Sequence, residues 1–232
     1  GRDPEENCLL ASTGDNLLGY VLVNQERPIK RAVLEGGVLP AHRRKGIGTR
    51  LFEWAFESGR QAGASIVHVA ALEDDTEQIG FLERRGFNLV RHHEQMRWTG
   101  GDTPEPDLPR GFVFRSFRFG DEAGLTEVQN AAFSNQWGFS PNTVEQISHI
   151  INMSRSDPEG VTLLLADEKV AGYCWTQTTG DASQAVGYIS MIGVHPKHQG
   201  KGLGRAALIY GIRSLLQLGI RVVELTVDKE NT

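Results

Sequence analysis

The chain has 232 residues, of which 39% are hydrophobic and 23% charged, and its formal net charge is −5. These proportions are ordinary for a folded protein and exclude a largely disordered chain. A net negative charge argues against a broad nucleic-acid-binding surface, and no apolar run approaches the roughly 20 residues of a membrane span. The two cysteines, Cys8 and Cys174, are too few for a disulfide framework or a zinc site. We therefore expect two buried thiols, no metal and a cytoplasmic location.

The first half of the chain alternates strand-like and helix-like segments. β-Branched and apolar runs predict strands, the last of them buried, at 8–12, 17–23, 31–38 and 65–71. Apolar residues at helical spacing predict helices at 49–61 and 76–85, and Gly63 and Gly86 follow them as stop signals. Residues 87–91 and 94–98 are expected to close the first sheet as a hairpin.

A segment without hydrophobic periodicity divides the chain. It contains Pro104, Pro106 and Pro109 among Gly, Asp and Glu residues, a composition typical of a linker. We therefore expect a first domain at 1–98, a linker at 99–111 and a second domain at 112–232.

The second half repeats the same kind of alternation. Strands are predicted at 112–116, 161–166, 170–176, 185–194 and 221–227. Helices are predicted at 121–133, 143–153 and 205–218, and either Asn142 or Thr143 is expected to cap the second of them.

A glycine-bearing loop occurs twice, each time between a predicted strand and a predicted helix. Residues 38–48 read Val-Leu-Pro-Ala-His-Arg-Arg-Lys-Gly-Ile-Gly, and residues 194–204 read Val-His-Pro-Lys-His-Gln-Gly-Lys-Gly-Leu-Gly. Both fit V-x-P-x-x-[R/Q]-x-x-G-x-G, and Gly46 and Gly202 lie 156 residues apart. This spacing indicates an internal repeat of domain size.

Such a loop is suited to binding an anion. Glycines let backbone N–H groups face a ligand without an intervening Cβ, and a helix N-terminus adds about half a positive charge. Nearby basic side chains can pair with further phosphate oxygens.

Two other interpretations of the loop remain open. A glycine turn between strand and helix needs no ligand. Dinucleotide binding would use Gly202-x-Gly204-x-x-Ala207, with Glu224 as the ribose-binding acid 20 residues beyond Gly204. Against the second interpretation, the first copy has Leu51 where the motif requires a small residue, and both loops are longer than the tight dinucleotide turn.

The two loops resemble the signature [Q/R]-x-x-G-x-[G/A] of the GCN5-related N-acetyltransferase (GNAT) superfamily, which Arg43–Gly48 and Gln199–Gly204 match at every specified position. The whole chain is similar to tandem members such as mycothiol synthase, most clearly in the second half. The resemblance implies an α+β fold of two acyl-CoA N-acyltransferase domains, each a mixed twisted sheet flanked by helices. It also implies an N-acetyltransferase that uses acetyl-CoA, without a metal, to acetylate the primary amine of a small molecule.

In that superfamily the loop binds the pyrophosphate of coenzyme A, and the end of the preceding strand exposes backbone groups to the pantetheine arm. The resemblance therefore implies one cofactor-binding set in each half. The first set is Gly36, Gly37, Val38, Arg43, Arg44, Lys45, Gly46, Ile47, Gly48 and Thr49. The second set is Ile192, Gly193, Val194, Gln199, Gly200, Lys201, Gly202, Leu203, Gly204 and Arg205.

Family enzymes often place a catalytic carboxylate on the strand before the loop and an acid tyrosine on a later helix. In the first half Glu35 fits the carboxylate position, but Leu82 occupies the acid position and cannot donate a proton. In the second half Tyr188 replaces the carboxylate, and a tyrosine with its usual pKa near 10 is a poor base at neutral pH. Ser190 is the further candidate, and Glu224 or His195 could assist.

We therefore expect the second domain to be the catalyst and the first to bind coenzyme A or support it. The rival from another class is a non-catalytic CoA-binding or scaffold module, which Tyr188 and Leu82 would favour. The chain begins at Gly1 and stops where the family places a further helix, so we expect truncation at both ends.

Overall fold

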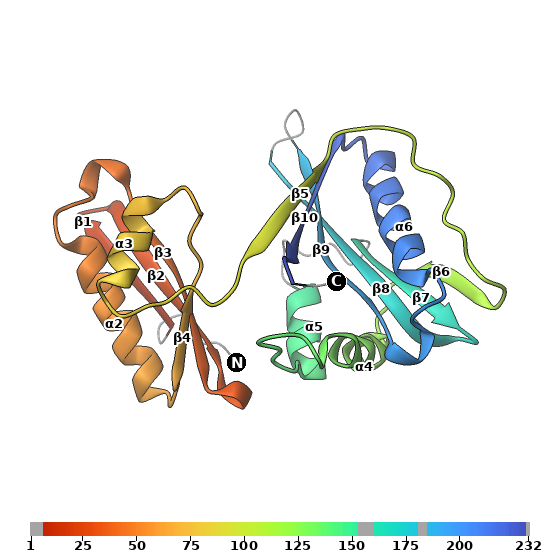
Figure 1. Ribbon diagram of the computed structural model, residues 1–232, viewed down its shortest axis with the longest axis horizontal. Helices are drawn as coiled ribbons and strands as arrows, with labels where there is room; N and C mark the ends of the chain where they lie inside the picture. The colour runs from red at the N-terminus through yellow and green to blue at the C-terminus, as the bar shows by residue number, and fades with distance from the viewer. Residues whose placement is uncertain (1–6, 153–159, 181–184, 231–232) are drawn as a thin grey trace. The chain divides into compact units, whose positions relative to one another are not determined.

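The structure, a computed structural model, describes residues 7–152, 160–180 and 185–230. The chain divides into two compact units, residues 1–89 and 90–232. Each unit contains one β-sheet with helices packed against it (Figure 1), which confirms the predicted α+β class.

The first unit has a four-stranded sheet in the order β1-β2-β3-β4. Its strands are β1 (Cys8–Thr13), β2 (Asn16–Glu26), β3 (Arg31–Val38) and β4 (Ile66–Val69), and its helices are α2 (Ile47–Gln61) and α3 (Thr76–Glu83). Neighbouring strands are antiparallel except β3 and β4, which are parallel. The apolar stripe of α2, with Leu51 and Ala55, packs on Val21, Ala32 and Leu34 of the sheet.

Two predictions for the first unit are wrong. The segment predicted as a buried strand, β4, is the edge of its sheet, and Ile66 is 49% exposed. The expected closing hairpin does not form, because residues 87–92 are not a strand. Residues His93–Trp98 instead form β5, which lies in the sheet of the second unit.

The pairing of β5 with β10 explains why β5 does not belong to the first sheet. β5 runs antiparallel to β10 (Val222–Asp228), with Trp98 opposite Val223, and Figure 1 shows the two strands side by side. Trp98 packs against the cluster that contains Val223, and Arg91 donates to Asp228 over 2.7 Å. Strand propensity identifies a strand but not its partner, so the sequence could not show which sheet β5 joins.

The second unit has a six-stranded sheet in the order β5-β10-β9-β8-β7-β6. Its remaining strands are β6 (Phe112–Ser116), β7 (Val161–Ala166), β8 (Lys169–Thr179) and β9 (Val186–Val194). Its helices are α4 (Glu122–Phe133), α5 (Val144–Asn152) and α6 (Leu203–Gln217). These elements match the predicted ones to within a few residues, except that residue 153 lies outside the described residues.

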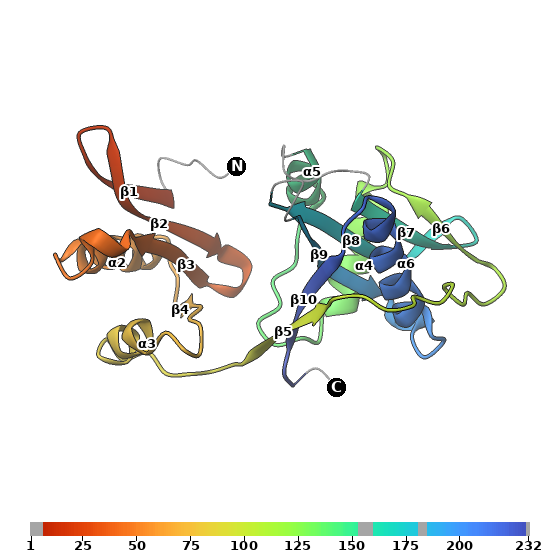
Figure 2. The same cartoon turned by 90° about the horizontal axis from the view of Figure 1, so that it is seen from above.

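Helices cover both faces of this sheet (Figures 1 and 2). α6 packs on one face through a cluster that includes Cys174, Ile189, Leu215 and Val223. α4 and α5 lie on the other face over Tyr173 and Trp175. Cys174 is therefore a buried thiol as predicted, whereas Cys8 in the first unit is only half-buried.

Thr143 caps α5, which settles the alternative that the sequence left open. Its hydroxyl accepts a hydrogen bond from the Gln146 N–H over 3.2 Å, and the Gln146 side chain accepts one from the Thr143 N–H over 2.8 Å. This reciprocal pair is a capping box. Asn142 instead bonds Asn130 of α4 through its backbone.

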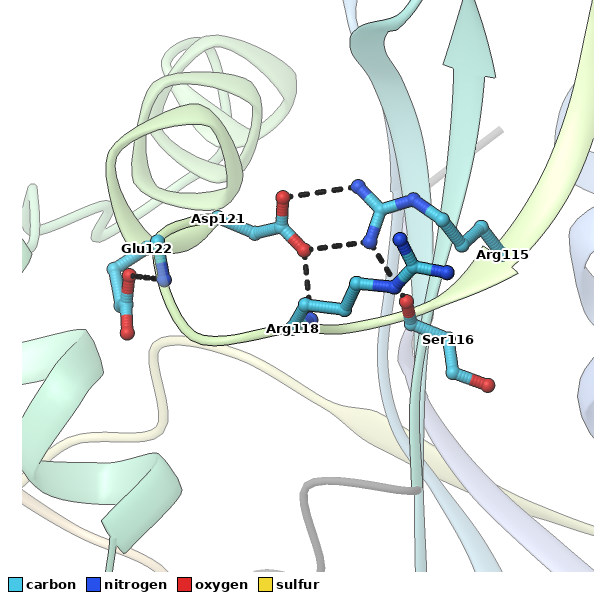
Figure 3. A network of polar contacts seen from close by, with 6 residues as sticks. Arg115, Ser116, Arg118, Asp121 and Glu122 are labelled. Atoms are coloured by element: carbon cyan, nitrogen blue, oxygen red, sulfur yellow. Dashed lines mark hydrogen bonds and ion pairs between the residues drawn. The ribbon is translucent and has the colours of Figure 1, made fainter.

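An arginine–carboxylate contact joins β6 to the start of α4 (Figure 3). Arg115 donates to both carboxylate oxygens of Asp121, over 2.8 and 2.9 Å, and the Arg118 N–H donates to the same carboxylate over 2.7 Å. The Arg115 guanidinium is the main reason that the pKa of Asp121 is lowered. Bidentate geometry makes this the kind of ion pair that contributes to stability.

Asp121→Asn should therefore destabilise the second unit at neutral pH by about 1–3 kcal/mol, because charged hydrogen bonds are lost. Because the pKa of Asp121 is lower in the folded chain than in the unfolded one, its contribution is complete above the ordinary value of about 3.9 and is lost as the pH falls below it. The measurement is urea unfolding at pH 7 and pH 3 by tryptophan fluorescence. Glu127→Gln, which removes an exposed charge from the same helix, is the control and should change little. A deficit for Asp121→Asn that is equal at both pH values would contradict the assignment.

Candidate functional site

The two glycine-bearing loops have the same backbone construction. Each strand ends at a valine and leads through a short 3-10 turn, Pro40–His42 or Pro196–His198, into the following helix. The side chain at the [R/Q] position turns back to the strand: Arg43 Nε donates to the Val38 carbonyl over 3.2 Å, and Gln199 Nε2 donates to the Val194 carbonyl over 3.0 Å. The motif therefore needs a long side chain with an N–H donor at this point.

Left-handed backbone explains the glycines that precede each helix. Gly46 and Gly202 occupy the N-cap positions with φ of 81° and 78°, a region that favours glycine. Gly200 also has a positive φ, 75°, whereas the matching residue in the first loop is Arg44, with φ of 60°. The second loop thus follows the backbone requirement more closely than the first.

The front of α6 presents backbone N–H groups to open space. The first helical hydrogen bond runs from the Ala206 N–H to the Gly202 carbonyl, over 3.0 Å, which leaves the preceding amides without intrahelical partners. A Cβ added at Gly204 would meet nothing within 4 Å. A hollow of about 510 Å³ lies here, lined by Ile192, Gly193, Val194, Gln199, Gly200, Gly202, Leu203, Gly204, Arg205 and Leu208. The hollow, the amides and the helix N-terminus together suit a phosphate-bearing ligand.

In both units the strand before the loop parts from its parallel neighbour. β9 pairs with β10 only as far as Ile189 opposite Leu225, and β3 pairs with β4 only as far as Leu34 opposite Val69. The remainder of each strand, 191–194 or 35–38, is paired on its other side alone. These strand ends expose backbone groups on one edge, beside the loop, as the family resemblance implies.

Only β9 has a β-bulge at this point. Trp175 of β8 faces Met191 and Thr176 faces Ile189, so Ser190 is an extra, exposed residue. In the first unit the β2–β3 register runs without interruption from Gly19 opposite Val38 to Glu26 opposite Arg31. A bulge increases the local twist and re-aims the strand. Ser190 directly follows the last residue of β9 that pairs with β10, whereas β3 separates from β4 without a bulge.

Glu35 and Tyr188 do not occupy equivalent positions in the two units. When residues are counted back from the loops, Glu35 is equivalent to Met191. Glu35 is exposed on β3, whereas Met191 packs against the core beneath α4. The positions that match Tyr188 and its partner on the next strand are Val33 and His68.

Tyr188 belongs to a polar row that crosses three strands. Glu224 of β10 lies opposite Tyr188 of β9 and opposite Arg97 of β5. Glu224 is 2% exposed, and its carboxylate accepts hydrogen bonds from Gln95 and, over 2.6 Å, from Arg97 Nε. The hydrogen bond to Glu224 raises the pKa of Tyr188, while Tyr188 and then Arg97 lower the pKa of Glu224. Tyr188 alone is therefore an even poorer base than its type suggests.

This row excludes the dinucleotide interpretation. Val223 and Leu225, the neighbours of Glu224 along β10, pack on the α6 face, so Glu224 points to the opposite face, away from the glycine loop. A ribose-binding acid would have to lie on the loop side. The sequence placed Glu224 at the right spacing, but spacing does not reveal the face.

Other predicted site residues have structural roles in the loops. His195 Nδ1 accepts a hydrogen bond from the Lys197 N–H over 3.2 Å. Lys45 donates to the Ala41 carbonyl over 3.1 Å, and Arg44 pairs with Glu77. Lys201 lies 5.6 Å from the ring centroid of Phe112. Of the basic residues expected at the loops, Arg205 is the one that lines the hollow.

Leu82, at the position where family members carry an acid tyrosine, is a core residue with 8% exposure. Across the described part of the chain, no three or more His, Cys, Asp or Glu side chains come together in a way that could hold a metal ion. None of the described helices is both long and apolar enough to cross a membrane.

Comparison with known proteins identifies acetyltransferases as similar to this chain. The acetyltransferase (GNAT) family model matches residues 1–87 and 123–232. Similar curated proteins include the mycothiol acetyltransferase of Pseudarthrobacter chlorophenolicus, 32% identical over 95% of this chain and 69% of that protein. The mycothiol acetyltransferase of Nocardia farcinica is also 32% identical, over 97% of this chain and 75% of that protein.

Two solved structures resemble the chain over nearly its whole length. A GCN5-related N-acetyltransferase from Sphaerobacter thermophilus has a TM-score of 0.73 and 27% identity, covering 100% of this chain and 74% of its own. A tandem GNAT protein from the clavulanic acid biosynthesis pathway has a TM-score of 0.72 and covers 97% of this chain and 75% of its own. At 18% identity the latter shows the fold alone.

The loop geometry predicts opposite stability effects for two glycines of the second loop. Gly200→Ala forces a Cβ into a left-handed backbone and should cost about 1 kcal/mol. Gly204→Ala lies inside α6 with open space around the new methyl group, so stability should stay the same or rise by up to about 1 kcal/mol. Urea unfolding measures both. Equal midpoints for the two variants would show that the loop backbone differs from the one described.

Proposed function

Because the chain belongs to the acetyltransferase (GNAT) family and is an N-acetyltransferase, we propose that its second unit transfers the acetyl group of acetyl-CoA to the primary amine of a small molecule. The observation that supports this most is the coincidence of three features on β9. The Ser190 bulge, the end of the β9–β10 pairing and the glycine-lined hollow follow one another along the chain.

The residues around the hollow fit coenzyme A. The amides at the front of α6, from Leu203 to Arg205, can donate to the pyrophosphate, and the Arg205 guanidinium can add a charge-assisted contact. The edge of Ile192–Val194 that faces away from β8 offers backbone groups to the amides of the pantetheine arm. When bound, acetyl-CoA supplies a thioester whose carbonyl carbon can accept an amine.

On the acceptor side we propose Tyr188 and Ser190 as the residues that the amine meets. Both lie where β9 leaves β10, and Ser190 is exposed. The relatives are named mycothiol acetyltransferases, so mycothiol-related small molecules are the first acceptors to test. A net charge of −5 favours a cationic acceptor weakly.

The first unit is proposed to bind coenzyme A, through Arg43–Thr49 and Gly36–Val38, without efficient transfer. Strand β3 of this unit pairs with β2 without a bulge. Glu35 lies three residues before Val38, whereas Tyr188 lies six residues before Val194. Leu82 cannot act as an acid.

A matched pair of variants tests which unit is the catalyst. Gly204→Val and Gly48→Val each place a branched side chain before the amides of its helix, and neither meets a close backbone contact. Gly204→Val should weaken coenzyme A binding at the second loop by roughly a hundredfold or more, since about two charge-assisted hydrogen bonds are lost. It should abolish most acetyl transfer, whereas Gly48→Val should leave transfer near the parent rate.

Calorimetry with coenzyme A and thiol release from acetyl-CoA in the presence of glucosamine or ethanolamine supply the two readouts. Loss of transfer in Gly48→Val alone would assign catalysis to the first unit. Unchanged binding and transfer in both variants would remove the loops from the mechanism.

A further inference from the structure

The first glycine loop already engages its own basic side chains within the protein. Arg43 and Lys45 each donate to a backbone carbonyl, over 3.2 and 3.1 Å. Arg44 forms an ion pair with Glu77. An anion at the start of α2 therefore needs either the release of one of these contacts or a cation from another element.

The start of α2 offers backbone amides, but it has a threonine where the second unit has an arginine. The first helical hydrogen bond runs from the Arg50 N–H to the Gly46 carbonyl, over 3.2 Å, so the amides of residues 47–49 have no intrahelical partners. In the second unit Arg205 lines the hollow, and the equivalent residue, 156 positions earlier, is Thr49.

Arg85 brings a guanidinium to this position from the end of α3. Its Nη2 lies 3.5 Å from the Thr49 hydroxyl oxygen, and its Nη1 donates to the Phe81 carbonyl over 3.1 Å. The guanidinium carbon is 3.6 Å from the ring centroid of Phe81 and 5.5 Å from that of Phe52. Phe52 is equivalent to Leu208, which also lines the hollow of the second unit. Arg85 therefore contacts the equivalents of two residues that line that hollow.

Packing alone does not account for a positive charge at this place. Phe52 and Phe81 already meet edge to face, with ring centroids 5.5 Å apart. Arg85 is half-buried, and none of the ion pairs in the described part of the chain includes it. The Phe81 ring offsets part of the lost hydration, but a cation that is partly buried without a carboxylate remains costly. A phosphate group would supply the missing negative charge, and it suits the planar guanidinium.

We propose that Arg85 binds the pyrophosphate of coenzyme A at the first loop, and so supplies there the guanidinium that Arg205 supplies at the second. This inference rests on the proposed binding of coenzyme A by the first unit. The amides of residues 47–49 and the remaining N–H groups of Arg85 would donate to the same phosphate oxygens. The two loops would thus bind the same ligand with cations from different elements.

Calorimetry with coenzyme A tests the role of Arg85 in a Gly204→Val background, where the second loop is blocked and binding reports on the first unit. Arg85→Met should lower the affinity about ten- to hundredfold, because a charge-assisted hydrogen bond is lost. Methionine keeps an apolar stem against the two phenylalanine rings, so the urea unfolding midpoint should change little. Arg84→Met, which removes the exposed neighbouring charge, is the control and should keep the affinity.

A rescue variant distinguishes ligand binding from packing. Thr49→Arg places a guanidinium at the position equivalent to Arg205, so it should restore most of the affinity that Arg85→Met loses. Arg85→Met should also make binding less sensitive to salt, since a charge contact with the ligand is removed. A loss of affinity that Thr49→Arg does not recover and that leaves the salt dependence unchanged would assign Arg85 to packing and overturn the proposal.

Chemical modification tests the same contact without a substitution at Arg85. Phenylglyoxal reacts with arginine side chains, and mass spectrometry locates the modified residues. In Gly204→Val, saturating coenzyme A should protect Arg85 from the reagent and leave Arg84 as reactive as before. Equal modification of Arg85 with and without coenzyme A would overturn the proposal even if Arg85→Met failed to fold.

The outcomes separate this inference from the proposed function on which it rests. A Gly204→Val chain that binds coenzyme A, with equal affinity after Arg85→Met, overturns the role of Arg85 alone. A Gly204→Val chain that binds no coenzyme A, while the parent does, overturns the proposed binding by the first unit, and the role of Arg85 with it.

Discussion

The register of β9 against its two neighbours is the constraint on which the site depends. The pairing of β9 with β10 ends at Ile189, directly before the extra residue Ser190, while the pairing with β8 continues. The backbone of the last residues of β9 is therefore unpaired on the β10 side, and the strand runs directly into the glycine loop. Because side chains alternate along a strand, the same extra residue also decides which face Tyr188 occupies.

The two units have the same loop backbone but different residues in the strand before the loop. Both loops close through the same [R/Q] side-chain bond to a valine carbonyl, and both helices begin at a glycine with left-handed backbone. They differ in the strand, where the second unit has a bulge and a Tyr188–Glu224 pair and the first has neither. The two units therefore share the construction of the loop and differ in the strand that precedes it.

Much of this architecture followed from the sequence, because its signals are local. The loops, their helices and most strands could be predicted from glycine positions and apolar spacing. The errors concern pairing: β5 joined the second sheet, and β4 became an edge. Glu35 and Tyr188 do not stand at matching positions of the two units, since Glu35 matches Met191 when both are counted back from the loops. Register and strand partners depend on contacts between distant residues, which periodicity within one segment does not report.

The most direct test of the account is a crystal structure of the chain with coenzyme A bound. We expect pyrophosphate oxygens on the amides of Leu203–Arg205 and the pantetheine arm along Ile192–Val194, ending beside Ser190 and Tyr188. Coenzyme A bound at the first loop alone, or a second-unit complex in which the arm lies away from the parted strands β9 and β10, would contradict it.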